Sequence, residues 1–263
     1  MPARVLLLLQ AHPSSFDARA QARGQALAFA RAREAELDVV VLLDASSRLS
    51  GAEASVTALF THQEEGDDAW HHAHALSAAV AEEARAAGVA CTVRDVETAH
   101  PLALLSETEA ACDLVVLERG AATLRFLPHY LEGASRPCLL AGRQGSGPVL
   151  VAYDGGAASA RSLQQLLWLG LGHAGVTVLS LGVDAEADAG VAKSYFAAHA
   201  IAAQCVTHPS GGHPAIQIGA EAQALDARLV VLGVRGRHGW RRALTGSTCR
   251  RLLQGDRALL LVP

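Results

Sequence analysis

Two tandem doubly wound α/β domains, each a five-stranded parallel sheet with helices on both faces, are predicted from three features of the sequence. The chain has 263 residues, about the length of two ordinary domains. Half of its residues are apolar but only 4% are aromatic, which favours aliphatic helices packed on buried strands over an all-β sandwich. The third feature is an internal repeat, because similar strand sequences recur in the same order in both halves.

The repeat lies in the apolar runs. It matches 4–10 (RVLLLLQ) with 148–154 (PVLVAYD), 112–120 (CDLVVLERG) with 227–236 (ARLVVLGVRG), and 136–141 (RPCLLA) with 256–262 (DRALLLV). Cys91 and Cys205 fall on matching strands. We therefore predict a first domain at 1–141 and a second at 148–263. Between them, 142–147 is rich in Gly and Ser, which indicates a flexible linker.

Short apolar runs alternate with longer Ala-rich stretches in the second half. They predict strands near 148–153, 175–181, 203–207, 228–232 and 257–262, and helices near 158–171, 186–200, 213–226 and 246–254. Strands that alternate with helices form parallel sheets with right-handed crossovers. The first half follows the same order, with a long polar loop at 44–66 before its second helix.

The cysteines and the N-terminal sequence indicate the cellular compartment in which the protein is expected. The cysteines show neither a CxxC motif nor metal-ligand spacing, so we expect free thiols at Cys91, Cys112, Cys138, Cys205 and Cys249. The apolar run at 5–9 is too short for a signal peptide or a membrane span. We therefore predict a cytoplasmic protein with no membrane partner.

A glycine-rich, basic stretch follows the predicted strand at 228–232. Its glycines, Gly233, Gly236 and Gly246, have the spacing G-x2-G-x9-G, and Ser247 comes directly after them. In doubly wound sheets, ligands bind outside the carboxyl ends of the strands where the strand order reverses. Because glycine permits close approach of the backbone to a ligand, this stretch indicates a binding loop.

The same stretch has the chemistry of a polyphosphate site. A helix predicted to begin at Gly246 leaves unpaired N–H donors, including those of Ser247 and Thr248, and its dipole favours an anion. The stretch also contains four closely spaced arginines, Arg235, Arg237, Arg241 and Arg242. It is not a Walker A loop, because that motif requires a lysine before the Ser or Thr. An exposed arginine-rich loop before a capped helix is the structural alternative.

This stretch resembles the ATP-binding signature of the universal stress protein family, G-x2-G-x9-G-[ST] after an apolar strand. The segment 149–159 (VLVAYDGGAAS) is similar to that family's first strand and its DGS loop, with Gly156 in place of the serine. The resemblance covers 148–263, whereas the first half resembles the same domain only in outline. The chain as a whole resembles a tandem universal stress protein.

The resemblance implies a bound ATP, ADP or AMP, with or without Mg²⁺. It places Asp154 near the nucleoside and the backbone of Leu181 against the adenine. It assigns the phosphates to Gly233, Gly236, Gly246 and Ser247, with Arg235, Arg237 and Thr248 beside them. It also implies that the two domains pair through their last strands within one chain, and it leaves a homodimer open.

The first half lacks these features. Gln10 is the counterpart of Asp154, Glu118 is the counterpart of Gly233, and no G-x9-G-[ST] follows Glu118. Because a carboxylate at that point repels phosphate, we predict that the first domain binds no nucleotide and serves as a packing partner.

A stress-response sensor or adaptor that binds an adenine nucleotide is the leading functional prediction. The alternatives are a slow ATPase or phosphotransferase, for which no acid or base beyond Asp154 can be identified, and a ligand-free interaction module. Nucleic-acid binding is disfavoured because the basic charge is local and the net charge is −4.

Two further motifs have structural interpretations. The sequence 70–74 (WHHAH) places His71, His72 and His74 together but offers no carboxylate or cysteine at useful spacing, so we interpret it as a solvated helix face. The GxGxxG at 170–175 follows a helix and precedes a strand, the reverse of the dinucleotide fingerprint, and is interpreted as a helix end and turn.

Overall fold

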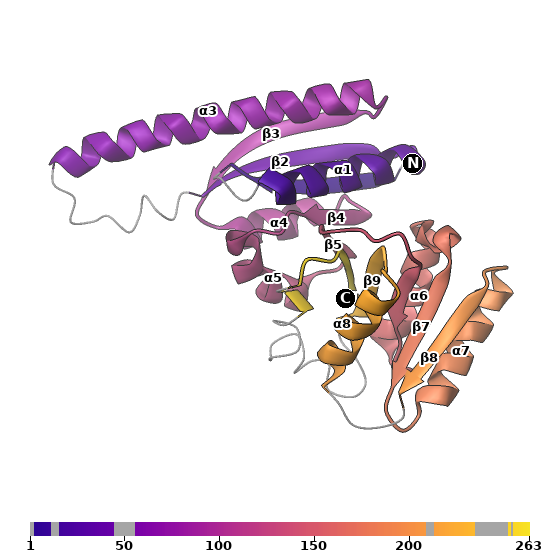
Figure 1. The fold of residues 1–263 in the computed structure, drawn as a ribbon. Helices are drawn as coiled ribbons and strands as arrows, with labels where there is room; N and C mark the ends of the chain where they lie inside the picture. The colour runs from indigo at the N-terminus through magenta and orange to yellow at the C-terminus, as the bar shows by residue number, and fades with distance from the viewer. Residues whose placement is uncertain (1–2, 12–15, 45–55, 209–212, 235–251, 254) are drawn as a thin grey trace. The chain divides into compact units, whose positions relative to one another are not determined.

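The computed structural model is an α/β fold of mostly parallel strands flanked by helices, as predicted (Figure 1). It describes residues 3–11, 16–44, 56–208, 213–234, 252–253 and 255–263. The chain divides into two compact units, Met1–Phe126 and Leu127–Pro263.

In the first unit the strands have the order β3-β2-β1-β4, and all of their pairings are parallel. The elements are β1 (Arg4–Gln10), α1 (Phe16–Ala32), β2 (Glu36–Asp44), α3 (Val56–Ala86), β3 (Cys91–Thr98), α4 (Pro101–Glu109) and β4 (Leu114–Leu117). Helix α5 (Ala121–Gly133) begins in this unit and ends in the second. The inner strands β1 and β4 are buried almost throughout, which explains their uninterrupted apolar sequences.

Helices cover both faces of the first sheet. Neighbouring residues of a strand point to opposite faces, and in β3 they contact different helices. Asp95 accepts a hydrogen bond from Ser77 of α3, whereas Arg94 donates one to Thr108 of α4 (Nη2 to Oγ1, 3.4 Å). Helices α3 and α4 therefore lie on opposite faces. Right-handed crossovers require this, because α3 connects β2 to β3 and α4 connects β3 to β4 in the opposite direction across the sheet.

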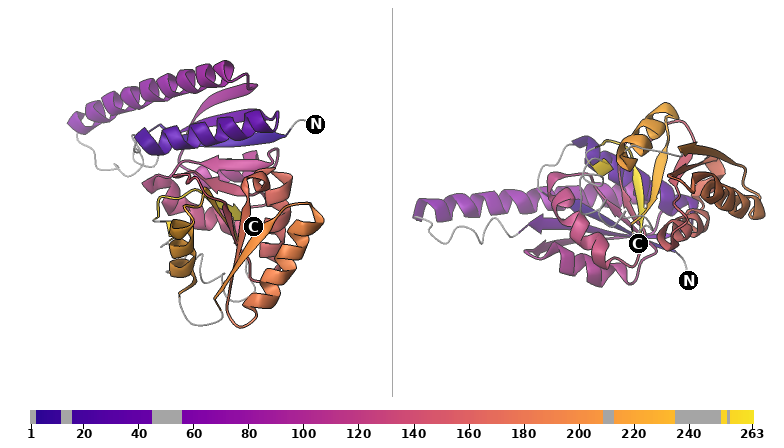
Figure 2. Two further views of the ribbon diagram at one scale, coloured as in Figure 1. Left: turned by 45° about the vertical axis from the view of Figure 1, so that its right-hand side comes forward. Right: turned by 90° about the horizontal axis from the view of Figure 1, so that it is seen from below.

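In the second unit the strands have the order β5-β10-β9-β6-β7-β8. The elements are β5 (Cys138–Leu140), β6 (Val149–Ala152), α6 (Ala157–Trp168), the 3₁₀ helix η1 (Leu171–Ala174), β7 (Val176–Leu181), α7 (Ala185–Ala198), β8 (Ala203–His208), α8 (Pro214–Ala224), β9 (Leu229–Gly233) and β10 (Leu259–Val262). Helices α7 and α8 lie on opposite sides of this sheet (Figure 2). The five strands of the second half, β6 to β10, pair in parallel.

The observed elements follow the predicted ones closely, with one exception in each half. Most of the helix predicted at 246–254 lies outside the described residues. In the first half, α3 begins at Val56, inside the segment predicted as a polar loop at 44–66. The glycines at 170–175 form a turn as predicted, because Gly170 has a left-handed conformation directly after α6 and Gly175 has a φ of 87°.

Strand β5 is the last strand of the first sequence half, yet it belongs to the second unit. It pairs antiparallel with β10, with Leu139 opposite Leu260. The pairing of last strands that the family resemblance implies is therefore present within the chain. It explains why the compact units divide at Phe126, before the boundary at 141 that the sequence repeat suggests.

The segment 142–147 is packed rather than flexible, which corrects the interpretation from its composition. A Cβ atom at Gly142, Gly145 or Gly147 would collide with a backbone carbonyl oxygen of Asp256, Asp226 or Leu225, respectively. Four N–H groups of this segment also donate hydrogen bonds, for example that of Gly147 to the Asp226 carbonyl oxygen at 2.9 Å. The glycines therefore permit close backbone contact.

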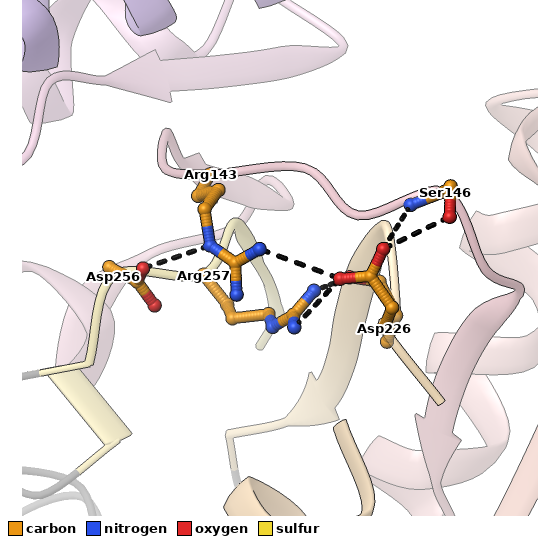
Figure 3. Close-up of polar contacts among 6 residues, drawn as sticks. Arg143, Ser146, Asp226, Asp256 and Arg257 are labelled. Atoms are coloured by element: carbon orange, nitrogen blue, oxygen red, sulfur yellow. Dashed lines mark hydrogen bonds and ion pairs between the residues drawn. The ribbon is translucent and has the colours of Figure 1, made fainter. Parts of the chain in front are cut away.

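Asp226 is the centre of the polar network that holds this segment (Figure 3). Its carboxylate accepts hydrogen bonds from the N–H and the hydroxyl of Ser146, at 2.8 and 3.0 Å. It also forms ion pairs with Arg257 (3.0 Å) and Arg143 (3.4 Å). The N–H of Ser146 and the Arg257 guanidinium together lower the pKa of Asp226 to about 2.

The remaining sequence predictions concern thiols and membranes. Among the described residues, Cys91, Cys112, Cys138 and Cys205 are not joined in disulfides, as predicted; Cys249 lies outside them. None of the described helices is both long and apolar enough to cross a bilayer.

Candidate functional site

The strand order of the second unit reverses at β6. Strands β7 and β8 follow on one side of β6, whereas β9 and β10 lie on the other. Ala152 at the end of β6 pairs with Leu179 of β7 and with Leu232 of β9. Continuation of this register by one or two residues brings Asp154, Leu181 and Gly233 to the same sheet edge, where doubly wound folds bind their ligands.

Asp154 is buried, with 6% of its surface exposed, and its carboxylate organises the turn into α6. Its Oδ1 accepts a hydrogen bond from the N–H of Gly156 at 3.0 Å and another from the hydroxyl of Ser159 at 2.6 Å. Gly155 between them has a φ of 69°, which favours glycine. A hydroxyl thus contacts this carboxylate although the turn itself has Gly156 where the family pattern has serine.

A second carboxylate, Asp188, lies beside this turn and was not identified from the sequence. A Cβ atom at Gly155 would collide with the Asp188 side chain. Burial raises the pKa of the neighbouring Tyr153, and the charges of Asp188 and then Asp154 raise it further, so both acids lie close enough to act on this phenol. The position of Asp188 in the first turn of α7, directly after β7, is the signal that could have indicated it.

Gly233 packs directly against the first turn of α6. A Cβ atom there would lie 2.6 Å from both the carbonyl carbon of Ala158 and the nitrogen of Ser159. The strand continues past it, because Val234 donates a hydrogen bond to the Val262 carbonyl oxygen at 2.7 Å. Close packing alone therefore requires glycine here, whatever a ligand adds.

Of the other predicted site residues, the structure describes one, Leu181, and six lie outside its described residues. Leu181 is half-buried at the end of β7, where it pairs with His208 and precedes Gly182, whose φ is 107°. The rest of the predicted phosphate loop lies outside the described residues, namely Arg235, Gly236, Arg237, Gly246, Ser247 and Thr248.

In the first unit, the equivalent sheet edge holds a buried carboxylate. Glu118 follows β4 as Gly233 ends β9, and none of its surface is exposed. Its Oε1 accepts a hydrogen bond from the N–H of Gln10, at the end of β1, at 3.1 Å. The residues predicted to make this half unsuitable for nucleotide therefore contact each other at the place where its strand order reverses.

The histidine cluster on α3 has an acidic partner from a different element. His74 Nδ1 lies 2.6 Å from Asp95 Oδ2 of β3. The sequence spacing gave no sign of this carboxylate, because it comes from the neighbouring strand. Even so, the described residues contain no group of three or more His, Cys, Asp or Glu side chains able to hold a metal ion.

The chain is similar to known proteins both in sequence and in fold. Residues 180–255 match the model of the universal stress protein family, so the resemblance predicted for the second half is confirmed. No curated protein sequence matches the chain.

Solved structures resemble nearly the whole chain. A universal stress protein from Archaeoglobus fulgidus DSM 4304 aligns with a TM-score of 0.68 and 16% identity, over 98% of this chain and 95% of its own. A functionally unknown protein from Pseudomonas aeruginosa PAO1 aligns with a TM-score of 0.59 and 18% identity, over 98% and 92% of the two chains. At these identities the likeness establishes the fold.

Proposed function

We propose that the second half of this chain, whose residues 180–255 match the universal stress protein family, binds one adenine nucleotide. The binding place is the crevice at the carboxyl ends of β6, β7 and β9. The observation that carries the proposal is the meeting of Asp154, Leu181 and Gly233 at the strand-order reversal, immediately before the G-x2-G-x9-G-S sequence.

The described residues fit the nucleoside end of such a ligand. The narrow turn at Gly155 and the contact of Gly233 with α6 keep the backbones of β6 and β9 close to the crevice. Asp154 supplies acceptor oxygens of the kind that bind ribose hydroxyls or an adenine amino group. Phosphate binding is assigned to the arginine- and glycine-rich segment after Val234 on its sequence alone.

We propose a role as a sensor or adaptor in a stress response, in which the nucleotide reports a cellular state to a partner protein. Slow ATP hydrolysis is the second candidate, and Asp188 favours it because it adds a carboxylate near Asp154. An efficient phosphoryl-transfer enzyme needs acids that hold Mg²⁺ and a group that positions the nucleophile.

The direct experiment is to denature the purified protein and identify the released small molecules by mass spectrometry, then to titrate ATP into nucleotide-free protein by calorimetry. We expect an adenine nucleotide and one site per chain. Arg235→Ala should weaken ATP binding, whereas Arg85→Ala, which removes an exposed arginine of α3 paired with Glu82, should not. Absence of any nucleotide and of any ATP affinity would contradict the proposal.

Hydrolysis is measured in the same preparation as phosphate release. We expect no turnover or slow turnover, far below the roughly 10 s⁻¹ of an ordinary enzyme. If slow turnover occurs and Asp188→Asn removes it without changing ATP affinity, the second candidate is favoured over the ligand-sensing role.

A further inference from the structure

At the strand-order reversal of the first unit, an arginine, a glutamate and a backbone N–H from three separate segments come together. Glu118 follows β4, Gln10 ends β1, and Arg19 lies in the first turns of α1. Arg19 Nε lies 3.7 Å from Glu118 Oε2, and only 18% of the Arg19 side chain is exposed. The guanidinium also donates to the Ala11 carbonyl oxygen at 3.4 Å, which fixes it beside the end of β1.

The groups that surround the Glu118 carboxylate are those of an anion-binding site. A backbone N–H and a guanidinium converge on a carboxylate, and both are groups that bind carboxylates and phosphates in proteins. A fully buried carboxylate without such partners would carry a large desolvation cost. In the second unit, the equivalent strand ends at Gly233, which has no side chain to place there.

We infer that the first unit retains an anion-binding position at its strand-order reversal and that the Glu118 carboxylate occupies it as an internal ligand. The chemical class that fits the position is a small carboxylate or another compact anion. The chain excludes external anions from the first unit because it supplies one itself. This inference does not depend on nucleotide binding by the second unit.

Removal of the internal ligand tests the inference directly. Glu118→Ala deletes the carboxylate and leaves a cavity beside Arg19 and the Gln10 N–H, so the variant should melt at a lower temperature than the wild type. Sodium acetate, compared with sodium chloride at the same ionic strength, should then raise its melting temperature by roughly 3 °C at about ten times the acetate dissociation constant. The wild-type protein should show no difference between the two salts.

Three control variants assign the effect to this position. Glu118→Gln keeps the volume of the side chain and leaves no room for acetate, so it should not respond. Glu118→Ala combined with Arg19→Gln keeps the cavity but removes the cation, so it should lose the response. Glu109→Ala removes another buried acidic side chain, on α4, and should not respond. An acetate response equal in all variants, or none in a folded Glu118→Ala protein, would overturn the inference.

A double-mutant cycle provides the test if Glu118→Ala does not fold. Arg19→Gln and Glu118→Gln should each lower the melting temperature, because each takes from a largely buried charge its oppositely charged neighbour. The double variant should melt no lower than the less stable single variant, since neither charge remains. Additive decreases would mean that the two side chains do not act as ligand and cation, and the inference would be wrong.

Discussion

At the carboxyl ends of β9 and β4, which have equivalent places in the two units, the chain carries Gly233 and Glu118 respectively. Gly233 allows the strand to lie against the first turn of α6, and the acid of that unit, Asp154, comes from the neighbouring strand. Glu118 instead directs a carboxylate to the end of β1 and to Arg19. One residue at equivalent sheet edges thus separates a strand end without a side chain from one whose carboxylate is buried against the neighbouring strand.

The two halves share a fold but carry different residues at their strand-order reversals. The same strand order and the same distribution of helices over the faces are present in both. The side chains at the two reversals differ in charge and in size. The same fold can therefore present different chemistry at this place, depending on the side chains at the strand ends.

The largest expected effect is on nucleotide binding at the predicted phosphate loop. Gly246→Val should abolish ATP binding, because a branched side chain blocks the approach of an anion to the helix start. Ser247→Ala should weaken binding by about 1–3 kcal/mol, the loss of one charge-assisted hydrogen bond. Calorimetry gives the affinities and thermal unfolding checks the fold. Unchanged ATP affinity in a folded Gly246→Val protein would mean that this stretch is only a loop and does not hold the phosphates.

A substitution at Gly233 tests the structural side of the comparison. Gly233→Ala should lower the free energy of unfolding by about 1–3 kcal/mol, because the added Cβ overlaps backbone atoms of Ala158 and Ser159. Gly219→Ala is the matched control, since nothing lies near a Cβ at that helical position, and it should stabilise the protein by up to about 1 kcal/mol. Denaturant unfolding measures both. Equal stability of the two variants would contradict the close packing of β9 on α6.

The counterparts Asp154 and Gln10 provide a third test. Asp154→Ala should weaken ATP binding and destabilise the protein by about 1–3 kcal/mol, because the Gly156 N–H and the Ser159 hydroxyl lose their buried acceptor. Gln10→Ala should leave ATP binding unchanged and cost less stability, because its hydrogen bond to Glu118 comes from the backbone. If Gln10→Ala weakens ATP binding as much as Asp154→Ala does, the two crevices are not functionally different.

The smallest expected effect is a pH dependence at the segment that connects the halves. Asp226 has its pKa lowered to about 2 in the folded protein, from an ordinary value of 3.8. Its contribution to stability is therefore fully present above the ordinary pKa and is lost as the pH falls through the folded value. The stability difference between the wild type and Asp226→Asn should be constant near neutral pH and should shrink as the pH approaches 2. A difference that grows toward low pH would contradict this assignment.

The sequence predicted the regular elements well because both faces of the inner strands are buried. A run such as 148–153, followed by an amphipathic segment, specifies a strand and a helix by itself, and β6 and α6 are found there. Local composition misled at 142–147, where glycine indicates mobility in isolation but permits close packing beside Asp226 and Asp256.

The site was predictable only where its residues follow strand ends. Asp154 and Gly233 lie at such ends, and the repeat identified Gln10 and Glu118 as their counterparts. The partners Arg19, Asp188 and Asp95 come from other elements, and their contacts depend on how helices pack on the sheet. No sequence period encodes that packing, so these residues required the three-dimensional structure.

The antiparallel pairing of β5 with β10 joins two strands of the same chain, so this pairing does not depend on protein concentration. A lone second half would end its sheet at β10 and expose an unpaired strand edge, which other chains could extend. Because β5 is covalently attached, it competes for that edge at the high effective concentration of a tethered partner. Fragments that begin at 148 should therefore self-associate more readily than the full chain at the same concentration, whereas the full chain should keep its β5–β10 pairing on dilution.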